Sequence, residues 1–173
     1  AFRPGDIFKS RKGLTVEIGN TDAEGRLILA DALTYVQKNY KTEVVIDMAT
    51  LTGACVVALG DFYAGLFSNN AGARALVEKA ASESMEPVWA LPVGKRYREM
   101  LNSDIADLNN IGGRYGGAST AAEFLHAFID EGQSWVHLDI AGVGMIKKPF
   151  NVYTASGSGY GVRLLTEVAR QMA

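Results

Sequence analysis

The sequence has few of the residues that build disulfide frameworks and no segment suited to crossing a membrane. It contains a single cysteine, Cys55, in 173 residues. One thiol cannot form a disulfide framework, so a reducing, cytoplasmic setting fits best. No apolar run approaches the ~20 residues that a membrane-spanning helix needs. Cys55 lies within an apolar run, so we predict a buried small side chain without chemistry of its own.

Neither sign of charge dominates. Lysine and arginine total 17 against 19 acidic residues, which gives a net charge of −2. Such a chain has no broad positive field to attract nucleic acid or an anionic membrane, so neither is an expected partner. Hydrophobic residues make up 48% and charged residues 21%, as in an ordinary folded domain.

Segments of strand and helix character alternate along the whole chain, with no repeat and no long linker. This order predicts one α/β domain, and we expect a three-layer α/β/α fold with a mixed, largely parallel central sheet. Strands are predicted at residues 14–18, 43–48, 62–67, 87–91 and 134–140, and helices at residues 25–38, 71–82, 94–101, 118–130 and 160–171.

A polar, glycine-rich stretch separates two of these helices. Residues 102–117 carry asparagine, aspartate and four glycines, and they lead into the helix at 118–130. The Gly-Lys-Ser/Thr ending of a phosphate-binding loop is absent, which argues against phosphate binding. We expect a long functional loop.

An acidic segment lies where a predicted strand leads into a predicted helix. On an extended chain, side chains two residues apart face the same side, so Asn20, Asp22 and Glu24 can point into one cleft. Hard divalent cations prefer carboxylate oxygens, and one carboxylate can bridge two cations about 3.5–4 Å apart. The segment from Thr21 to Glu24 also matches the Thr-x-x-Glu capping box of a helix start. Spacing alone favours the capping box.

The wider segment carries a family signature. Residues 20–27, Asn-Thr-Asp-Ala-Glu-Gly-Arg-Leu, are the eight-residue signature of the leucyl (cytosol) aminopeptidase family. Further matches follow in family order at residues 3–7, 49–54, 116–122 and 137–142. The chain therefore resembles the C-terminal part of the catalytic domain of that family over nearly its whole length.

The resemblance implies a two-metal site. It makes Asp22 a ligand of one metal, Glu24 the carboxylate shared by both metals, and Arg26 the catalytic arginine. The implied cofactors are two divalent cations, manganese or zinc, with a bicarbonate held by Arg26. The implied reaction is the release of N-terminal amino acids from peptides by a metal-activated water.

Four further positions would line the site of the N-terminal substrate residue. By resemblance these are Thr50, Leu51, Gly53 and Ala141, and Gly53 would permit a close backbone approach. Some relatives have methionine three residues beyond Ala141, where this chain has Gly144. Side-chain preference therefore does not carry over, and the glycine allows a wider pocket.

The two histidines do not match catalytic positions of the family. His137 and Asp139 share one face of the predicted strand at 134–140, an alternation typical of a half-buried strand with structural side chains. His126 lies among apolar residues of the helix at 118–130 and is predicted to be packed there.

The family motifs that supply two lysines and two further aspartates have no counterpart in this chain. We therefore expect a truncated chain that is inactive by itself. The complete enzyme is expected to form a homo-oligomer, a hexamer, that acts on peptides with a free N-terminus. The alternative is a catalytically silent assembly domain of such an oligomer.

Overall fold

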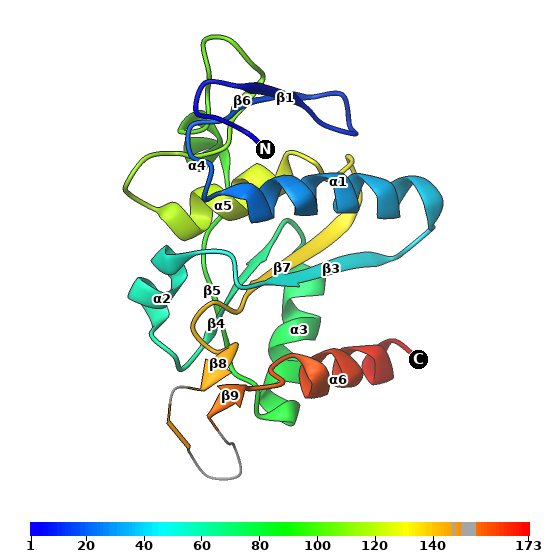
Figure 1. The fold of residues 1–173 in the computed structure, drawn as a ribbon. Helices are drawn as coiled ribbons and strands as arrows, with labels where there is room; N and C mark the ends of the chain where they lie inside the picture. Colours follow the sequence, from blue (N-terminus) through cyan, green and yellow to red (C-terminus); the bar gives the residue numbers. More distant parts are fainter. Residues whose placement is uncertain (147, 150–154) are drawn as a thin grey trace.

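A four-stranded mixed sheet lies at the centre of the computed structural model, which describes residues 1–146, 148–149 and 155–173 (Figure 1). Its strands, in spatial order, are β3 (Val44–Ala49), β7 (Ser134–Asp139), β4 (Ala64–Ser68) and β5 (Val88–Ala90). The pairs β3–β7 and β4–β5 are parallel, while β7 and β4 are antiparallel. The predicted mixed sheet is confirmed.

Helices cover both faces of this sheet (Figure 1). On one face lie α1 (Glu24–Asn39) and α5 (Gly117–His126), and on the other α3 (Ala71–Ser84) packs with α6 (Val162–Met172). Alternation along β7 explains the two cores, because Trp135 packs with the α1 and α5 side, while Val136 and Leu138 pack with the α3 and α6 side. The three-layer α/β/α fold is confirmed.

Shorter elements surround these layers. They are β1 (Ile7–Lys9), β2 (Thr15–Glu17), α2 (Gly53–Leu59), α4 (Lys95–Glu99), β6 (Leu108–Asn109), β8 (Met145–Ile146) and β9 (Ser156–Gly157). Every predicted strand and helix overlaps an observed element. Sequence patterns missed β1, β8, β9, the seven-residue α2, and β6, which pairs with β2 inside the predicted loop. No helix in the described part of the chain is long and apolar enough to cross a membrane.

Strand β7 is buried on both faces, not half-buried as predicted. From Trp135 to Asp139 every residue is buried. The indole nitrogen of Trp135 donates to Asp47 Oδ2 (2.7 Å), and His137 Nδ1 lies 2.6 Å from Asp47 Oδ1. The ring of His126 stacks on Trp135 with centroids 5.6 Å apart. Both histidines therefore pack against the aromatic centre of the sheet.

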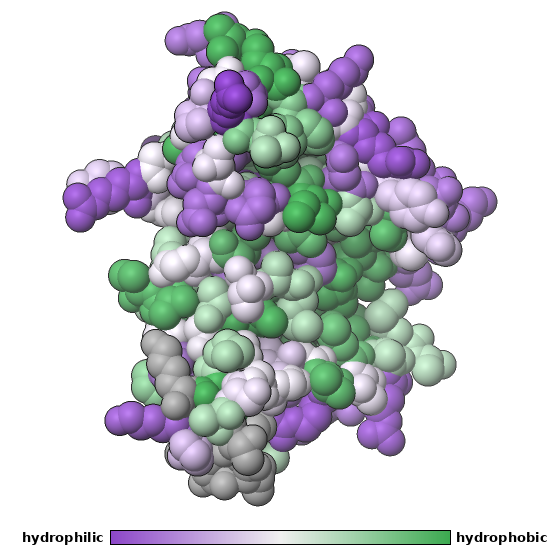
Figure 2. Space-filling view, viewed as in Figure 1, coloured by the Kyte–Doolittle hydropathy of each residue, from purple (hydrophilic) through white to green (hydrophobic). Residues whose placement is uncertain are grey.

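Strand β3 forms one edge of the sheet, and an apolar groove runs along it. The space-filling view shows apolar side chains gathered between α1 and α6, where this edge lies (Figure 2). A groove of about 250 Å³ is lined by residues of α1 and β3, among them Leu29, Leu33, Val36, Val44 and Ile46.

The buried side chain of Asn110 fixes the turn that precedes α1. Its Oδ1 accepts hydrogen bonds from the amides of Gly19 (2.8 Å) and Asn20 (3.2 Å), and its Nδ2 donates to the Asn20 carbonyl (2.7 Å). Its own carbonyl accepts from the guanidinium of Arg26 (2.6 Å). Asn110, just after β6, therefore binds both the backbone before α1 and a side chain of the first turn of α1.

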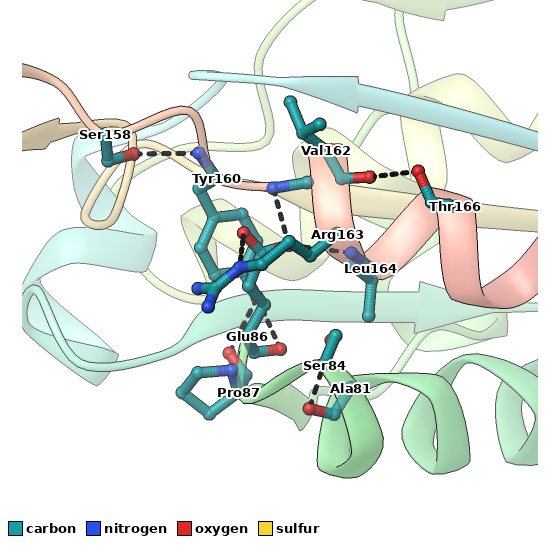
Figure 3. A network of polar contacts seen from close by, with 11 residues as sticks. Ala81, Ser84, Glu86, Pro87, Ser158, Tyr160, Val162, Arg163, Leu164 and Thr166 are labelled. Atoms are coloured by element: carbon teal, nitrogen blue, oxygen red, sulfur yellow. Dashed lines mark hydrogen bonds and ion pairs between the residues drawn. The ribbon is translucent and has the colours of Figure 1, made fainter.

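A second buried polar group, the carboxylate of Glu86, holds the start of α6 (Figure 3). Its Oε2 accepts from the amides of Gly161 (3.0 Å) and Leu164 (2.8 Å), and Arg163 forms an ion pair with Oε1 (3.4 Å). Because the first amides of a helix lack partners within it, a carboxylate there satisfies them and complements the helix dipole. Glu86 thus anchors the start of α6 to the segment between α3 and β5.

Replacing Glu86 with alanine should lower the free energy of unfolding by about 1–3 kcal/mol, because the buried amides of Gly161 and Leu164 lose their acceptor. Urea unfolding measures the change. Glu78→Ala is the control, since Glu78 pairs with Arg74 on the exposed side of α3 and should contribute less than about 1 kcal/mol. Equal losses in the two variants would contradict the anchoring role.

Asn110→Ala should loosen the turn before α1. The amides of Gly19 and Asn20 would lose an acceptor that contributes about 1–3 kcal/mol, so their hydrogen exchange should accelerate by about tenfold or more. Hydrogen exchange followed by NMR tests this. Asn39→Ala, which removes only an exposed hydrogen bond to the Tyr35 carbonyl, should leave both amides unchanged. Unaltered exchange in Asn110→Ala would show that Asn110 does not fix the turn before α1.

Candidate functional site

The acidic segment forms a turn at the start of α1. The Asp22 amide donates to Asn20 Oδ1 (2.9 Å), and α1 begins at Glu24 after Ala23, which makes no side-chain capping bond. The Thr21 to Glu24 capping box is therefore absent, and the segment is not extended as predicted. The Asn20 side chain therefore closes a turn that precedes α1, and the helix start has no side-chain cap. Asp22 and Glu24 are exposed at this turn.

Beneath the turn lies the buried guanidinium of Arg26, with a relative exposure of 8%. One of its amino groups donates to the Asn110 carbonyl, while its Nε has no hydrogen-bond partner among the described residues. Burial lowers the pKa of Arg26 to about 10, and the carboxylate of Asp139 acts in the opposite direction. Arg26 therefore keeps its positive charge at neutral pH and has hydrogen-bonding capacity left over.

The turn stands beside the carboxyl ends of two parallel strands. Ala49 at the end of β3 is the register partner of Asp139 at the end of β7. The loop that follows β3 reaches α1, because a Cβ placed on Gly25 would lie 3.8 Å from Leu51 Cδ1. Open α/β sheets place their ligands at this edge. The structure thus brings the acidic turn and Leu51 to one end of the sheet.

The fully buried carboxylate of Asp139 joins the loops that follow the two strands. Its Oδ1 accepts from the amides of Leu51 and Ala141, each at 3.1 Å, and its Oδ2 accepts from the Thr52 hydroxyl (2.7 Å). The Thr52 hydroxyl in turn accepts from the Cys55 amide and starts α2. Sequence patterns marked Asp139 only as a structural side chain and gave no sign of these partners.

Two glycines of the candidate pocket have different surroundings. A Cβ on Gly144 would lie 3.0 Å from the Ile140 carbonyl and 3.2 Å from Thr50 Cγ2, so the backbone at Gly144 packs directly beside Thr50. A Cβ on Gly53 would meet no described atom within 4 Å, so the described chain leaves the space beside its backbone open. The wider pocket at Gly144 and the close approach at Gly53 stay predictions.

Cys55 is confirmed as a buried side chain, with a relative exposure of 1%. Burial, with the nearby Asp139 carboxylate acting in the same direction, raises the pKa of the Cys55 thiol to about 11. The side chain stays protonated at neutral pH, and the thiolate is the form that reacts. Cys55 therefore serves packing.

The described residues offer a divalent cation two carboxylates, those of Asp22 and Glu24. Their hard oxygen atoms suit manganese, magnesium or zinc. Within residues 1–146, 148–149 and 155–173, no group of three or more histidine, cysteine, aspartate or glutamate side chains is arranged to hold a metal ion. The donor chemistry fits such cations, while the number of donors falls short of a full set.

Comparison with known proteins agrees with this arrangement. A family model described as the catalytic domain of the cytosol aminopeptidase family matches residues 1–166. The probable cytosol aminopeptidase of Chlorobium phaeobacteroides is 51% identical over 173 residues, which are 100% of this chain and 34% of that protein. The corresponding protein of Rhodopseudomonas palustris is 53% identical over 95% of this chain and 33% of its own length.

Solved structures share the fold. A variant of tomato leucine aminopeptidase superposes with a TM-score of 0.93 at 44% identity, covering 98% of this chain and 32% of that one. The bottromycin maturation enzyme BotP gives a TM-score of 0.95 at 36% identity, covering 99% of this chain and 38% of that one. The chain spans about one third of the length of the relatives it matches. Over that third, the chain belongs to the cytosol aminopeptidase family.

Proposed function

We propose that this chain carries part of the active site of a two-metal aminopeptidase that releases N-terminal amino acids from peptides. The observation that carries the proposal is the meeting of the acidic turn, the buried cation Arg26 and the Leu51 loop at one edge of the sheet. Membership of the cytosol aminopeptidase family supports it.

In this proposal Asp22 and Glu24 hold the metal pair, with Glu24 shared by both ions. Two divalent cations, manganese or zinc, supply an activated water to the first peptide carbonyl when they are bound. The contribution of this chain is to present both carboxylates on a turn that Asn110 fixes through Asn20. A fixed turn lowers the cost of gathering ligands around a cation.

Arg26 would hold the anion that accepts the proton. Its buried Nε has no described partner, and its charge is retained at neutral pH, which leaves Arg26 a charged donor for a small anion such as bicarbonate. Because the guanidinium is already tied to the Asn110 carbonyl, its orientation is set before any anion binds. Arg26 would orient a base and would not ligate metal.

The substrate's N-terminal residue would lie against Thr50, Leu51, Gly53 and Ala141. Thr50 and Gly53 are exposed, and Leu51 and Ala141 are half-buried at the carboxyl end of the sheet.

We propose that the complete enzyme is a cytoplasmic homo-oligomer, a hexamer. By itself the chain supplies two carboxylates to the metal pair, and we propose that it is inactive without the family's remaining ligands.

In the full-length protein, Glu24→Gln should reduce turnover of leucine p-nitroanilide to less than about a tenth, because a bridging ligand serves both ions and aligns the attacking water. Steady-state kinetics at saturating manganese measure this. Glu43→Gln provides the control, because Glu43 is an exposed carboxylate beyond the opposite end of α1. Turnover near the wild-type value in Glu24→Gln would remove Glu24 from the site.

Calorimetric titration of the 173-residue chain with manganese or zinc should give no tight binding of two ions, because an ion held by one or two protein carboxylates has too few donors. The same chain should not turn over leucine p-nitroanilide at the rate of the full-length protein. Tight binding of two ions, with turnover lost in Glu24→Ala, would show that this chain completes the site in another way.

A further inference from the structure

Asp139 is a buried carboxylate whose partners all come from loops beside the candidate site. It has no exposed surface, and both of its oxygens accept hydrogen bonds. A buried carboxylate is costly unless its oxygens are paired and its charge is balanced. The hydrogen-bond partners of Asp139 therefore indicate which part of the structure this carboxylate holds in place.

These partners belong to two segments that are far apart in sequence. The amide of Leu51 and the hydroxyl of Thr52 follow β3, whereas the amide of Ala141 follows β7. One oxygen, Oδ1, accepts from both Leu51 and Ala141, at 3.1 Å each. One oxygen atom therefore bridges the two loops, next to the backbone hydrogen bond from the Ile140 amide to the Ala49 carbonyl (2.9 Å).

The carboxylate of Asp139 also acts on Arg26, which lies on the other side of the site. It raises the pKa of the Arg26 guanidinium, against the larger lowering by burial. Arg26 is tied to the Asn110 carbonyl, and Asn110 also fixes the turn before α1. Asp139 thus binds the two loops through hydrogen bonds and acts on Arg26 through its charge.

We propose that Asp139 is a positioning residue that holds the Leu51 and Ala141 loops as one rigid pocket wall and thereby sets the enzyme's preference for the N-terminal side chain of its substrate. This inference rests on the proposed function, because it needs these loops to bind that side chain. Asp139 touches neither substrate nor metal in this scheme and acts through the backbone of the loops.

A purely structural role for Asp139 can be separated from this one, because the chain contains a matched group. Glu86 is also a buried carboxylate with two backbone amides bound to one oxygen, and it holds the start of α6 instead of the pocket loops. Glu86→Gln therefore imposes a comparable loss at a place that we do not assign to substrate binding.

The test uses the full-length protein loaded with manganese and compares wild type with Asp139→Asn and Glu86→Gln. The readouts are kcat and KM for the p-nitroanilides of leucine, methionine, alanine and glycine, together with the midpoint of thermal unfolding. In Asp139→Asn we expect the ratio of kcat/KM between the best and worst substrates to fall about tenfold, mainly through KM. A change of this size corresponds to the loss of contacts with about one methylene group of the substrate side chain. In Glu86→Gln the midpoint should fall while this ratio stays at the wild-type value.

Thr52→Val provides a second variant if Asp139→Asn does not fold. It removes the bond to Oδ2, together with the acceptor of the Cys55 amide, but leaves the bonds to Oδ1 in place, so it should lower the same ratio by a smaller factor. An unchanged substrate preference in the folded Asp139→Asn protein, or equal changes in Asp139→Asn and Glu86→Gln, would overturn the inference alone. A wild-type protein that hydrolyses none of the four substrates would overturn the proposed function, and this inference with it.

Discussion

The burial of β7 on both faces is the constraint on which the rest of the structure depends. A strand between two helix layers has no access to water, so every polar group that it carries needs a partner inside the protein. β7 carries Trp135, His137 and Asp139 on one face. Asp47 of the neighbouring strand pairs with the first two, and the loops beyond the strand ends pair with Asp139. These bonds tie β7 to β3 and to the loops beyond the strand ends, while the buried Nε2 of His137 has no hydrogen-bond partner among the described residues.

Buried polar groups also need hydrogen-bond partners beside the candidate site. Polar groups in the interior, Arg26, Asn110 and Asp139, hold the loops, while the groups proposed to meet metal, Asp22 and Glu24, stand exposed above them. The three buried side chains form hydrogen bonds to the backbone of the turn and the loops. These bonds hold the segments that carry the exposed carboxylates and the candidate pocket residues. Rigid support of this kind is what a site needs in order to present its ligands in one geometry.

Local sequence patterns predicted those elements whose stability comes from their own periodicity. The apolar stripe of α1 and the alternation of helices and strands gave the fold class and the three layers. Two of the failures involve residues distant in sequence. In place of the Thr21 to Glu24 capping box there is a turn whose Asn20 backbone is bound by Asn110, 90 residues later. The hydrogen-bonding role of Asp139 likewise depends on Leu51, 88 residues earlier.

The aromatic stack inside the sheet also gives the protein an optical signature of its own. Trp135 has no exposed surface, stacks on His126 and donates to Asp47, whereas Trp89 on the edge strand β5 is 57% exposed. The two indoles therefore sit in opposite environments, and an aqueous quencher reaches only the one at the edge. Emission from Trp135 reports on the packed centre of the sheet, and emission from Trp89 reports on its rim. A chain with two tryptophans thus carries two separate fluorescent reporters without any label.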